Sequence, residues 1–232
     1  MREIIFDTET TGLDKNQDRV VEIGCVEMVD RYVTGRNFHV YINPQGVIIP
    51  PEVVAIHGLT NERLANEPKF EQIVDDFLTF IGESPMIAHN ANFDLGFLNA
   101  ELARLEKPPI LVDRIIDTLA MARRKYPMGP NTLDALCKRF GIDNSHRQLH
   151  GALLDAEILA DVYIELIGGK QASLNFVSAS QKNVNLNRIQ PLAQALVRPN
   201  PLPARLSAED YAAHEALIAK IGDKALWKQF LE

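Results

Sequence analysis

The chain has 232 residues, of which 46% are hydrophobic, enough for one full core with short appendages. No apolar run approaches the ~18–20 residues needed to span a bilayer, and no signal peptide precedes the first predicted strand, so we expect a cytoplasmic protein with no membrane contact. The net charge of −7 disfavours unaided, high-affinity binding to nucleic acid, because phosphate contacts supply most nonspecific affinity. Cys25 lies in an apolar predicted strand and Cys137 in an amphipathic predicted helix, without metal-ligand spacing, so we expect buried free thiols.

Three strands are predicted first, over about residues 3–7, 19–29 and 36–42, and their short connections favour an antiparallel meander. A loop with Pro50 and Pro51 follows. Strands then alternate with helices, which predicts an α/β fold with a mixed sheet flanked by helices. The later elements are a helix over 70–81, a strand over 85–89, a helix over 93–106, a strand over 110–116, a helix over 117–125, a helix from Asn131 or Thr132 to Gly141, and a last helix to Ile167.

Asp7 and Glu9 end the first predicted strand, directly after the apolar residues 4–6. Residues i and i+2 of a strand point to the same side, so both carboxylates share one side of the strand end. Neighbouring carboxylates repel each other and resist burial, and a divalent cation such as Mg²⁺ or Mn²⁺ would remove that conflict. A solvated acidic turn is the alternative interpretation of this stretch.

Asp94 lies where a second strand gives way to a helix. The segment 86–88 reads as a short strand, and leucines then recur at three- and four-residue steps, as in an amphipathic helix. Asp94 is therefore either a second acidic ligand or a carboxylate stabilised by the helix dipole.

His150 and Asp155 lie near the start of the last helix of this domain, which Gly168 and Gly169 end. Five residues of ideal helix would turn His150 about 140° away from Asp155. The two side chains can share a site only if His150 lies in the loop or first turn before the helix. A surface histidine and a solvated aspartate are the alternative interpretations.

Together these segments resemble the DEDDh 3′–5′ exonucleases, whose acidic and histidine positions appear here in the expected order. Further likeness to the proofreading (epsilon) subunits of bacterial DNA polymerase III comes from Gly24, from residues 51–60 and from residues 145–155. The likeness is close over about residues 1–170 and looser in the tail. It implies a ribonuclease-H-like fold with the active site at the ends of the first strands. The five matching positions are Asp7, Glu9, Asp94, His150 and Asp155.

The resemblance also implies roles for these residues. Two divalent metal ions, Mg²⁺ or Mn²⁺, would be held with Asp7 as the bridge, Glu9 and Asp155 as direct ligands, and Asp94 on the second ion. His150 would take the proton from the attacking water, and a histidine pKa near ~6.5 suits that task.

The resemblance further implies a site for the 3′-terminal nucleotide. Glu9 and Asp155 are expected to touch it, and Glu52 and His57 match the positions that contact it. A turn-stabilising pair after the two prolines is the alternative interpretation of Glu52 and His57.

The composition changes after residue 169. Residues 166–208 contain no Asp or Glu, and residues 177–206 are rich in Asn, Gln, Ser and Pro, which predicts a flexible linker. Ser207 and Asp210 then have capping-box spacing at a helix start. The single tryptophan, Trp227, lies beside Phe230 in an apolar tail, and both are typical interface anchors.

Residues 171–176 resemble the short peptides with which bacterial replication proteins bind the sliding clamp. We therefore expect an exonuclease domain over 1–169, a clamp-binding peptide and linker over 170–206, and a polymerase-binding segment over 207–232. An ordinary domain-to-linker junction is the alternative for the peptide. Its expected clamp-binding residues are Gln171, Ser173, Leu174 and Phe176.

The implied function is proofreading of the single-stranded 3′ end of a DNA primer. The implied partners are the catalytic (alpha) subunit of DNA polymerase III, the sliding clamp and a small theta-like subunit. A free-standing exoribonuclease in RNA processing and a non-catalytic replisome adaptor are the alternatives, and the intact carboxylate set with His150 argues against the adaptor. A phosphatase with Asp7 as nucleophile would not call for the spacing of His150 and Asp155.

Overall fold

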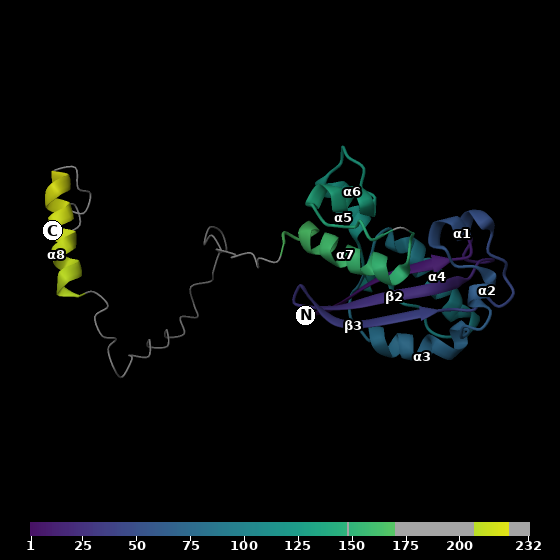
Figure 1. Cartoon of the computed structure of the whole chain (residues 1–232). Coiled ribbons are helices and arrows are strands. Elements are labelled where there is room, and N and C mark those ends of the chain that lie inside the picture. Colours follow the sequence, from purple (N-terminus) through teal and green to yellow (C-terminus); the bar gives the residue numbers. More distant parts are fainter. Residues whose placement is uncertain (148, 170–206, 223–232) are drawn as a thin grey trace, which may run out of the picture. The chain divides into compact units, whose positions relative to one another are not determined.

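The computed structural model describes residues 1–147, 149–169 and 207–222. The chain divides into two units, Met1–Phe176 and Val177–Glu232. In the second unit, helix α8 (Ala208–Ile221) begins with the predicted capping box of Ser207 and Asp210 (Figure 1). The predicted linker, the clamp peptide with Gln171, Ser173, Leu174 and Phe176, and the tail residues Trp227 and Phe230 lie outside the described residues.

A five-stranded mixed sheet in the order β3-β2-β1-β4-β5 forms the centre of the first unit, which confirms the predicted fold class. β1 pairs antiparallel with β2 and parallel with β4, β2 pairs antiparallel with β3, and β4 pairs parallel with β5. The strands are β1 (Arg2–Thr10), β2 (Val20–Val29), β3 (Tyr32–Tyr41), β4 (Met86–Ala88) and β5 (Ile115–Asp117).

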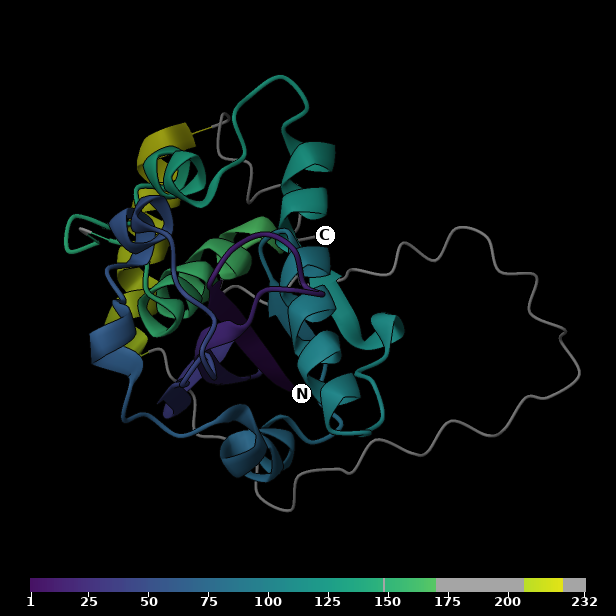
Figure 2. The same ribbon diagram turned by 90° about the vertical axis from the view of Figure 1, so that its right-hand side faces the viewer.

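Helices cover both faces of this sheet (Figures 1 and 2). Alternate residues of β1 enter different cores: Ile4 and Phe6 pack with the helices of one face, and Ile5 packs with those of the other. This explains why the first strand reads as a continuous apolar run. The first face carries α3 (Phe70–Ile81) and α4 (Ala91–Arg104), and the second carries α5 (Thr118–Lys125), α6 (Leu133–Phe140) and α7 (Ala152–Leu166).

Two short helices, α1 (Pro51–His57) and α2 (Asn61–Leu64), replace the loop predicted after Pro50. Pro51 suits the first turn of α1, because that position needs no N–H donor, and Gly58 ends the helix in the left-handed conformation. Helices of two turns or fewer show little periodicity, which is why the prediction missed them.

The predicted strand over 110–116 was also wrong over most of its length. A 3₁₀ turn (Val112–Arg114) occupies its middle, and β5 begins only at Ile115. In contrast, Thr132 and Gly141 cap α6 as predicted, and both cysteines are free and buried. Among the described residues, no helix is long and apolar enough to cross a bilayer.

Gly24 sets how closely α7 approaches the sheet. A Cβ atom added at Gly24 of β2 would lie 2.2 Å from backbone atoms of Ala152 and Leu153, in the first turn of α7. Real Cβ atoms do not tolerate such contacts, so only glycine allows this spacing. The start of α7, which bears Asp155, is therefore placed by a missing side chain in β2.

Gly24→Ala should lower the free energy of unfolding by about 1–3 kcal/mol, the usual range for overpacking, because α7 must move away from the sheet. Gly151→Ala is the control for the steric contact: it lies at the same helix start and its added Cβ would meet no atom within 4 Å, so its loss of stability should be limited to the preference of an N-cap for glycine over alanine. Denaturant unfolding of both variants measures the difference. Equal stability of the Gly24 variant and the wild type would show that the contact can relax without cost.

Candidate active site

Asp7 and Glu9 project from the end of β1 on the side that faces α7. They follow Ile5 at two-residue steps, and Ile5 packs with the core that contains α7. Asp7 pairs in register with Gly24, where α7 comes closest to the sheet. Both carboxylates line a cavity of about 860 Å³. Asp7 and Glu9 therefore lie near Asp155, because they share the side of β1 that faces α7 and because α7 packs closely against the sheet there.

Asp94 reaches the same cavity from the first turn of α4. Its Oδ1 accepts hydrogen bonds from the Thr8 backbone N–H at 3.1 Å and the Thr8 hydroxyl at 2.7 Å. Asn90 starts the helix with φ 68°, a left-handed conformation that asparagine tolerates, and its N–H donates to Asp117. Asp94 is thus fixed to β1 as well as to its own helix.

His150 lies before α7, as the shared site requires, because Gly151 is the N-cap of that helix. The His150 backbone N–H donates to the carbonyl of Ile56 in α1 at 3.0 Å. Its Nδ1 lies 3.4 Å from Oδ2 of Asp155, and its side chain is 49% exposed. Ligand atoms of Glu9, His150 and Asp155 all lie within 4.8 Å of one another. The structure therefore places all five predicted residues around one cavity.

The carboxyl groups of this cavity are in electrostatic conflict. Burial, with the neighbouring carboxylates, raises the pKa of Asp7 well above its ordinary value. Burial, followed by the charges of Glu22, Asp155 and Asp94, raises the pKa of Glu9 to about 8. Burial also raises the pKa of Asp94. Ionisation of these clustered, buried carboxyl groups is unfavourable without a counter-charge. Their oxygen atoms therefore suit a divalent cation such as Mg²⁺ or Mn²⁺.

Several cavity residues were missed by the sequence analysis. His89 lies at the end of β4, and its Nδ1 contacts the Thr118 hydroxyl at 2.9 Å. The Thr118 hydroxyl donates its proton to the Ala88 carbonyl, so His89 Nδ1 carries the proton in this contact. Arg123, Asp134 and Arg147 line the cavity as well. His89 directly precedes Asn90 and Arg147 lies three residues before His150, and that proximity to the motifs was the available signal.

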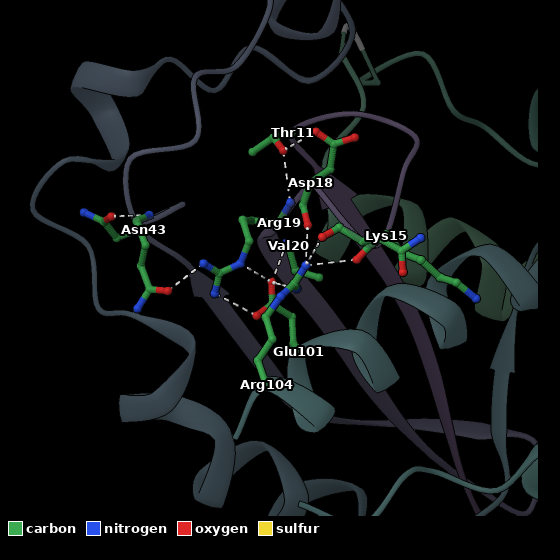
Figure 3. Close-up of polar contacts among 10 residues, drawn as sticks. Thr11, Lys15, Asp18, Arg19, Val20, Asn43, Glu101 and Arg104 are labelled. Atoms are coloured by element: carbon green, nitrogen blue, oxygen red, sulfur yellow. Dashed lines mark hydrogen bonds and ion pairs between the residues drawn. The ribbon is translucent and has the colours of Figure 1, made fainter. Parts of the chain in front are cut away.

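The loop that follows Glu9 is held by a buried ionic network (Figure 3). Glu101 of α4, 1% exposed, accepts two hydrogen bonds from the Arg19 guanidinium at 2.7 and 2.8 Å and one from the Val20 backbone N–H. Arg104 contacts Glu101 and donates to the carbonyls of Lys15, Asn16 and Asp18. The end of β1 is thereby anchored to α4.

Glu52 and His57 do not line the cavity. Glu52 is exposed on α1, whereas His57 is buried and its Nδ1 accepts from the Leu59 N–H at 3.0 Å. Burial lowers the pKa of His57, which favours the neutral ring with its proton on Nε2. Within the described residues that Nε2 is buried and makes no hydrogen bond of normal geometry, and a contact with the Thr10 backbone partly offsets the lowering of the pKa.

Comparison with known proteins agrees with this geometry. A family model described as Exonuclease matches residues 4–163. The DNA polymerase III subunit epsilon of Rickettsia felis is 53% identical over 190 residues, covering 80% of this chain and 82% of that protein. The subunit epsilon of Escherichia coli (strain K12) is 40% identical over 240 residues, covering 98% and 97%.

Solved structures share the fold. Exonuclease X in complex with 5′ overhanging duplex DNA superposes with a TM-score of 0.58 at 28% identity, covering 71% of this chain and 90% of that one. The nuclease domain of 3′hExo, a DEDDh family member bound to rAMP, gives a TM-score of 0.62 at 16% identity, covering 74% and 94%.

The family match, the epsilon-subunit relatives and the acidic cavity define a nuclease that hydrolyses phosphodiester bonds, and the chain belongs to the exonuclease family. Within that family, it resembles the epsilon subunits of DNA polymerase III over nearly its whole length.

Stabilisation by Mg²⁺ should grow as the pH rises from about 6 to about 9. Between the ordinary value of 4.5 and the raised pKa of about 8, the folded protein keeps a proton on Glu9 that the unfolded chain has lost. The folded state therefore loses stability as the pH rises through this window, and a bound cation offsets that loss.

Thermal unfolding with Mg²⁺ or with EDTA across this range measures the effect. Asp113→Asn removes an exposed carboxylate outside the cavity and should leave the pH dependence unchanged. A Mg²⁺ effect that is constant with pH would contradict the electrostatic conflict.

Proposed function

We propose that this chain is the 3′–5′ proofreading exonuclease of a bacterial replicative DNA polymerase. The observation that carries the proposal is the 40% identity to the epsilon subunit of Escherichia coli across 98% of the chain, together with the five predicted residues around one cavity. Its substrate is the single-stranded 3′ end of a DNA primer, from which it removes mispaired nucleotides. We place this activity in the cytoplasm, where a bacterial replicative polymerase works.

Asp7, Glu9, Asp94 and Asp155 would hold two divalent ions, Mg²⁺ or Mn²⁺. Bound there, the ions would activate water and stabilise the leaving oxygen. His150 takes the proton from the attacking water. Its half-exposed ring lies at the mouth of the cavity beside Asp155, so it can pass that proton on to solvent.

The proposed substrate contacts include two residues inside the cavity and two outside it. Glu9 and Asp155 touch the terminal nucleotide from inside the cavity. His57 would donate from Nε2, which is buried and makes no hydrogen bond of normal geometry among the described residues, because an incompletely paired buried donor is costly unless a ligand completes it. Glu52 joins from the exposed face of α1.

A free-standing exoribonuclease has weaker support. The DEDDh neighbour bound to rAMP shares the fold at 16% identity, whereas the relatives that cover nearly the whole chain carry the name of the DNA polymerase subunit. We therefore favour the DNA substrate.

The test compares Asp7→Asn with His150→Ala on a 3′-mispaired primer, a matched primer and an RNA strand. Asp7→Asn should remove nearly all turnover and weaken Mn²⁺ binding, because it removes one of the carboxylates that would hold the ions. His150→Ala should lower turnover by about 10²–10⁴ and leave Mn²⁺ affinity nearly unchanged, as expected for a general base.

Calorimetric titration of Mn²⁺, beside rates with and without EDTA, separates these roles. Asp113→Asn is again the control. Full activity in EDTA, or RNA hydrolysed faster than the mispaired primer, would overturn the proposal. Equal loss of metal affinity and rate in the His150 variant would make His150 a ligand.

We also propose how the nuclease reaches its substrate. Residues 170–206 form a clamp-binding peptide and linker, and residues 207–232 bind the alpha subunit of DNA polymerase III through Trp227 and Phe230. A small theta-like subunit is a further partner. Support comes from the full-length likeness to epsilon subunits and from the acidic balance of the chain, which disfavours unaided DNA binding.

Leu174→Ala combined with Phe176→Ala should abolish clamp binding, and Trp227→Ala should weaken the alpha complex by about 2 kcal/mol or more if it is a hot spot. Neither change should alter hydrolysis of a free single strand, because Leu174, Phe176 and Trp227 all lie outside the predicted exonuclease domain of residues 1–169. Calorimetry with the purified partners measures both. Unchanged affinity of a variant for its partner would remove the role of that segment.

A further inference from the structure

Arg147 makes the closest ionic contact of the candidate active site. Its Nε lies 2.5 Å from Oδ1 of Asp155, and its Nη2 lies 2.7 Å from Oδ2. This is a two-point guanidinium–carboxylate pair, and both side chains are nearly buried, with 8% and 5% exposed. Nη2 also lies 2.8 Å from Nδ1 of His150. One guanidinium thus contacts both the carboxylate and the imidazole of the last motif.

Arg147 and a divalent ion would compete for the carboxylate of Asp155. The guanidinium uses both carboxylate oxygens, and those oxygens are also the atoms that would ligate an ion. A full positive charge within hydrogen-bond distance of a ligand repels any cation that the ligand binds. If Asp155 ligates an ion, at least one of the two hydrogen bonds from Arg147 to Asp155 must therefore break.

Asp134 supplies the anchor on the other side. Nη1 of Arg147 lies 3.0 and 3.1 Å from the two oxygens of Asp134, whose side chain is 60% exposed. A guanidinium released from Asp155 would stay tethered to Asp134 and remain at the cavity. It would not be lost to solvent.

The cavity also carries less positive than negative charge, which disfavours a polyanionic substrate. Its lining contains five carboxylates, and the arginines among the described lining residues are Arg123 and Arg147. A phosphodiester chain entering this cavity needs a cation near its backbone, and a guanidinium offers two parallel donors to phosphate oxygens.

We propose that Arg147 is a substrate-positioning residue whose guanidinium competes with the divalent ion for Asp155 and, once displaced, binds a phosphate of the DNA strand. The proposal rests on the proposed nuclease function and names a further contact of that site. Metal binding and substrate binding would then be coupled, because the first frees the group that serves the second.

Two measurements on Arg147→Gln test the proposal. Without DNA, its affinity for Mn²⁺ should rise about 10-fold or more, the effect of losing one competing charge-assisted contact. With Mn²⁺ saturating and a strand carrying 3′ phosphorothioate linkages, the slope of log K against log salt should shrink by about 0.7, the value for one phosphate contact on single strands.

Arg123→Gln is the matched control, since it removes the same charge from the same cavity. Among the described residues the Arg123 side chain makes no hydrogen bond or ion pair, so its removal should change Mn²⁺ affinity much less. Arg147→Lys keeps the charge but not the two-point geometry. It should fold if the glutamine variant does not, and it should keep the salt slope while tightening Mn²⁺ binding less.

Unchanged or weaker Mn²⁺ binding in Arg147→Gln, or equal tightening in Arg123→Gln, would overturn the competition. An unchanged salt slope would overturn the phosphate contact. Failure of the proposed function itself looks different: wild type would bind no Mn²⁺, or Asp155→Asn would bind it as tightly as wild type, whatever Arg147 does.

Discussion

Mutual repulsion among carboxylates at one end of the sheet is the constraint on which this site depends. Asp7, Glu9, Asp94 and Asp155 come from three separate elements, and the folded chain holds them around a single cavity. Burial, reinforced by the charges of neighbouring carboxylates, raises the pKa values of Asp7 and Glu9, and a bound cation would offset that cost. The chain tolerates this arrangement because packing elsewhere fixes every backbone that carries a carboxylate.

Three contacts distant from the chemistry hold those backbones. Gly24 lets the first turn of α7 press against β2, which sets the height of Asp155 over β1. Thr8 binds Asp94 from β1, so the start of α4 cannot drift from the strand. Glu101 clamps the loop after Glu9 through Arg19 and Arg104 (Figure 3). A buried carboxylate with two arginines is stable only when all members are paired, so this loop has one well-defined path.

The five predicted residues that line the cavity were selected by their order along the chain, which resembles that of the DEDDh exonucleases, because each local signal alone left an alternative interpretation open. Asp7 and Glu9 end an apolar strand, Asp94 opens a periodic helix, and His150 stands one residue before the N-cap of another. Glu101 gave no such signal. It reads as an ordinary polar residue on a helix, and its burial follows only from Arg19, 82 positions earlier in the chain. The ion pair between Arg147 and Asp155 likewise depends on the path of the loop before α7. The number of residues between Arg147 and Asp155 in the sequence does not determine that path.

The electrostatics of the cavity also bear on how such a nuclease would select its substrate. A negatively charged site attracts divalent ions but repels a DNA strand, so binding of the ions must come first or the strand must be delivered. Coupling through Arg147 would serve the first requirement, since an ion at Asp155 would free a cation for the phosphate. Tethering to a polymerase would serve the second, because a short flexible linker gives an effective concentration on the order of millimolar. A site with weak intrinsic affinity then acts only on an end presented to it. Under the proposed function, that end is a frayed primer terminus, and a paired terminus stays with the polymerase.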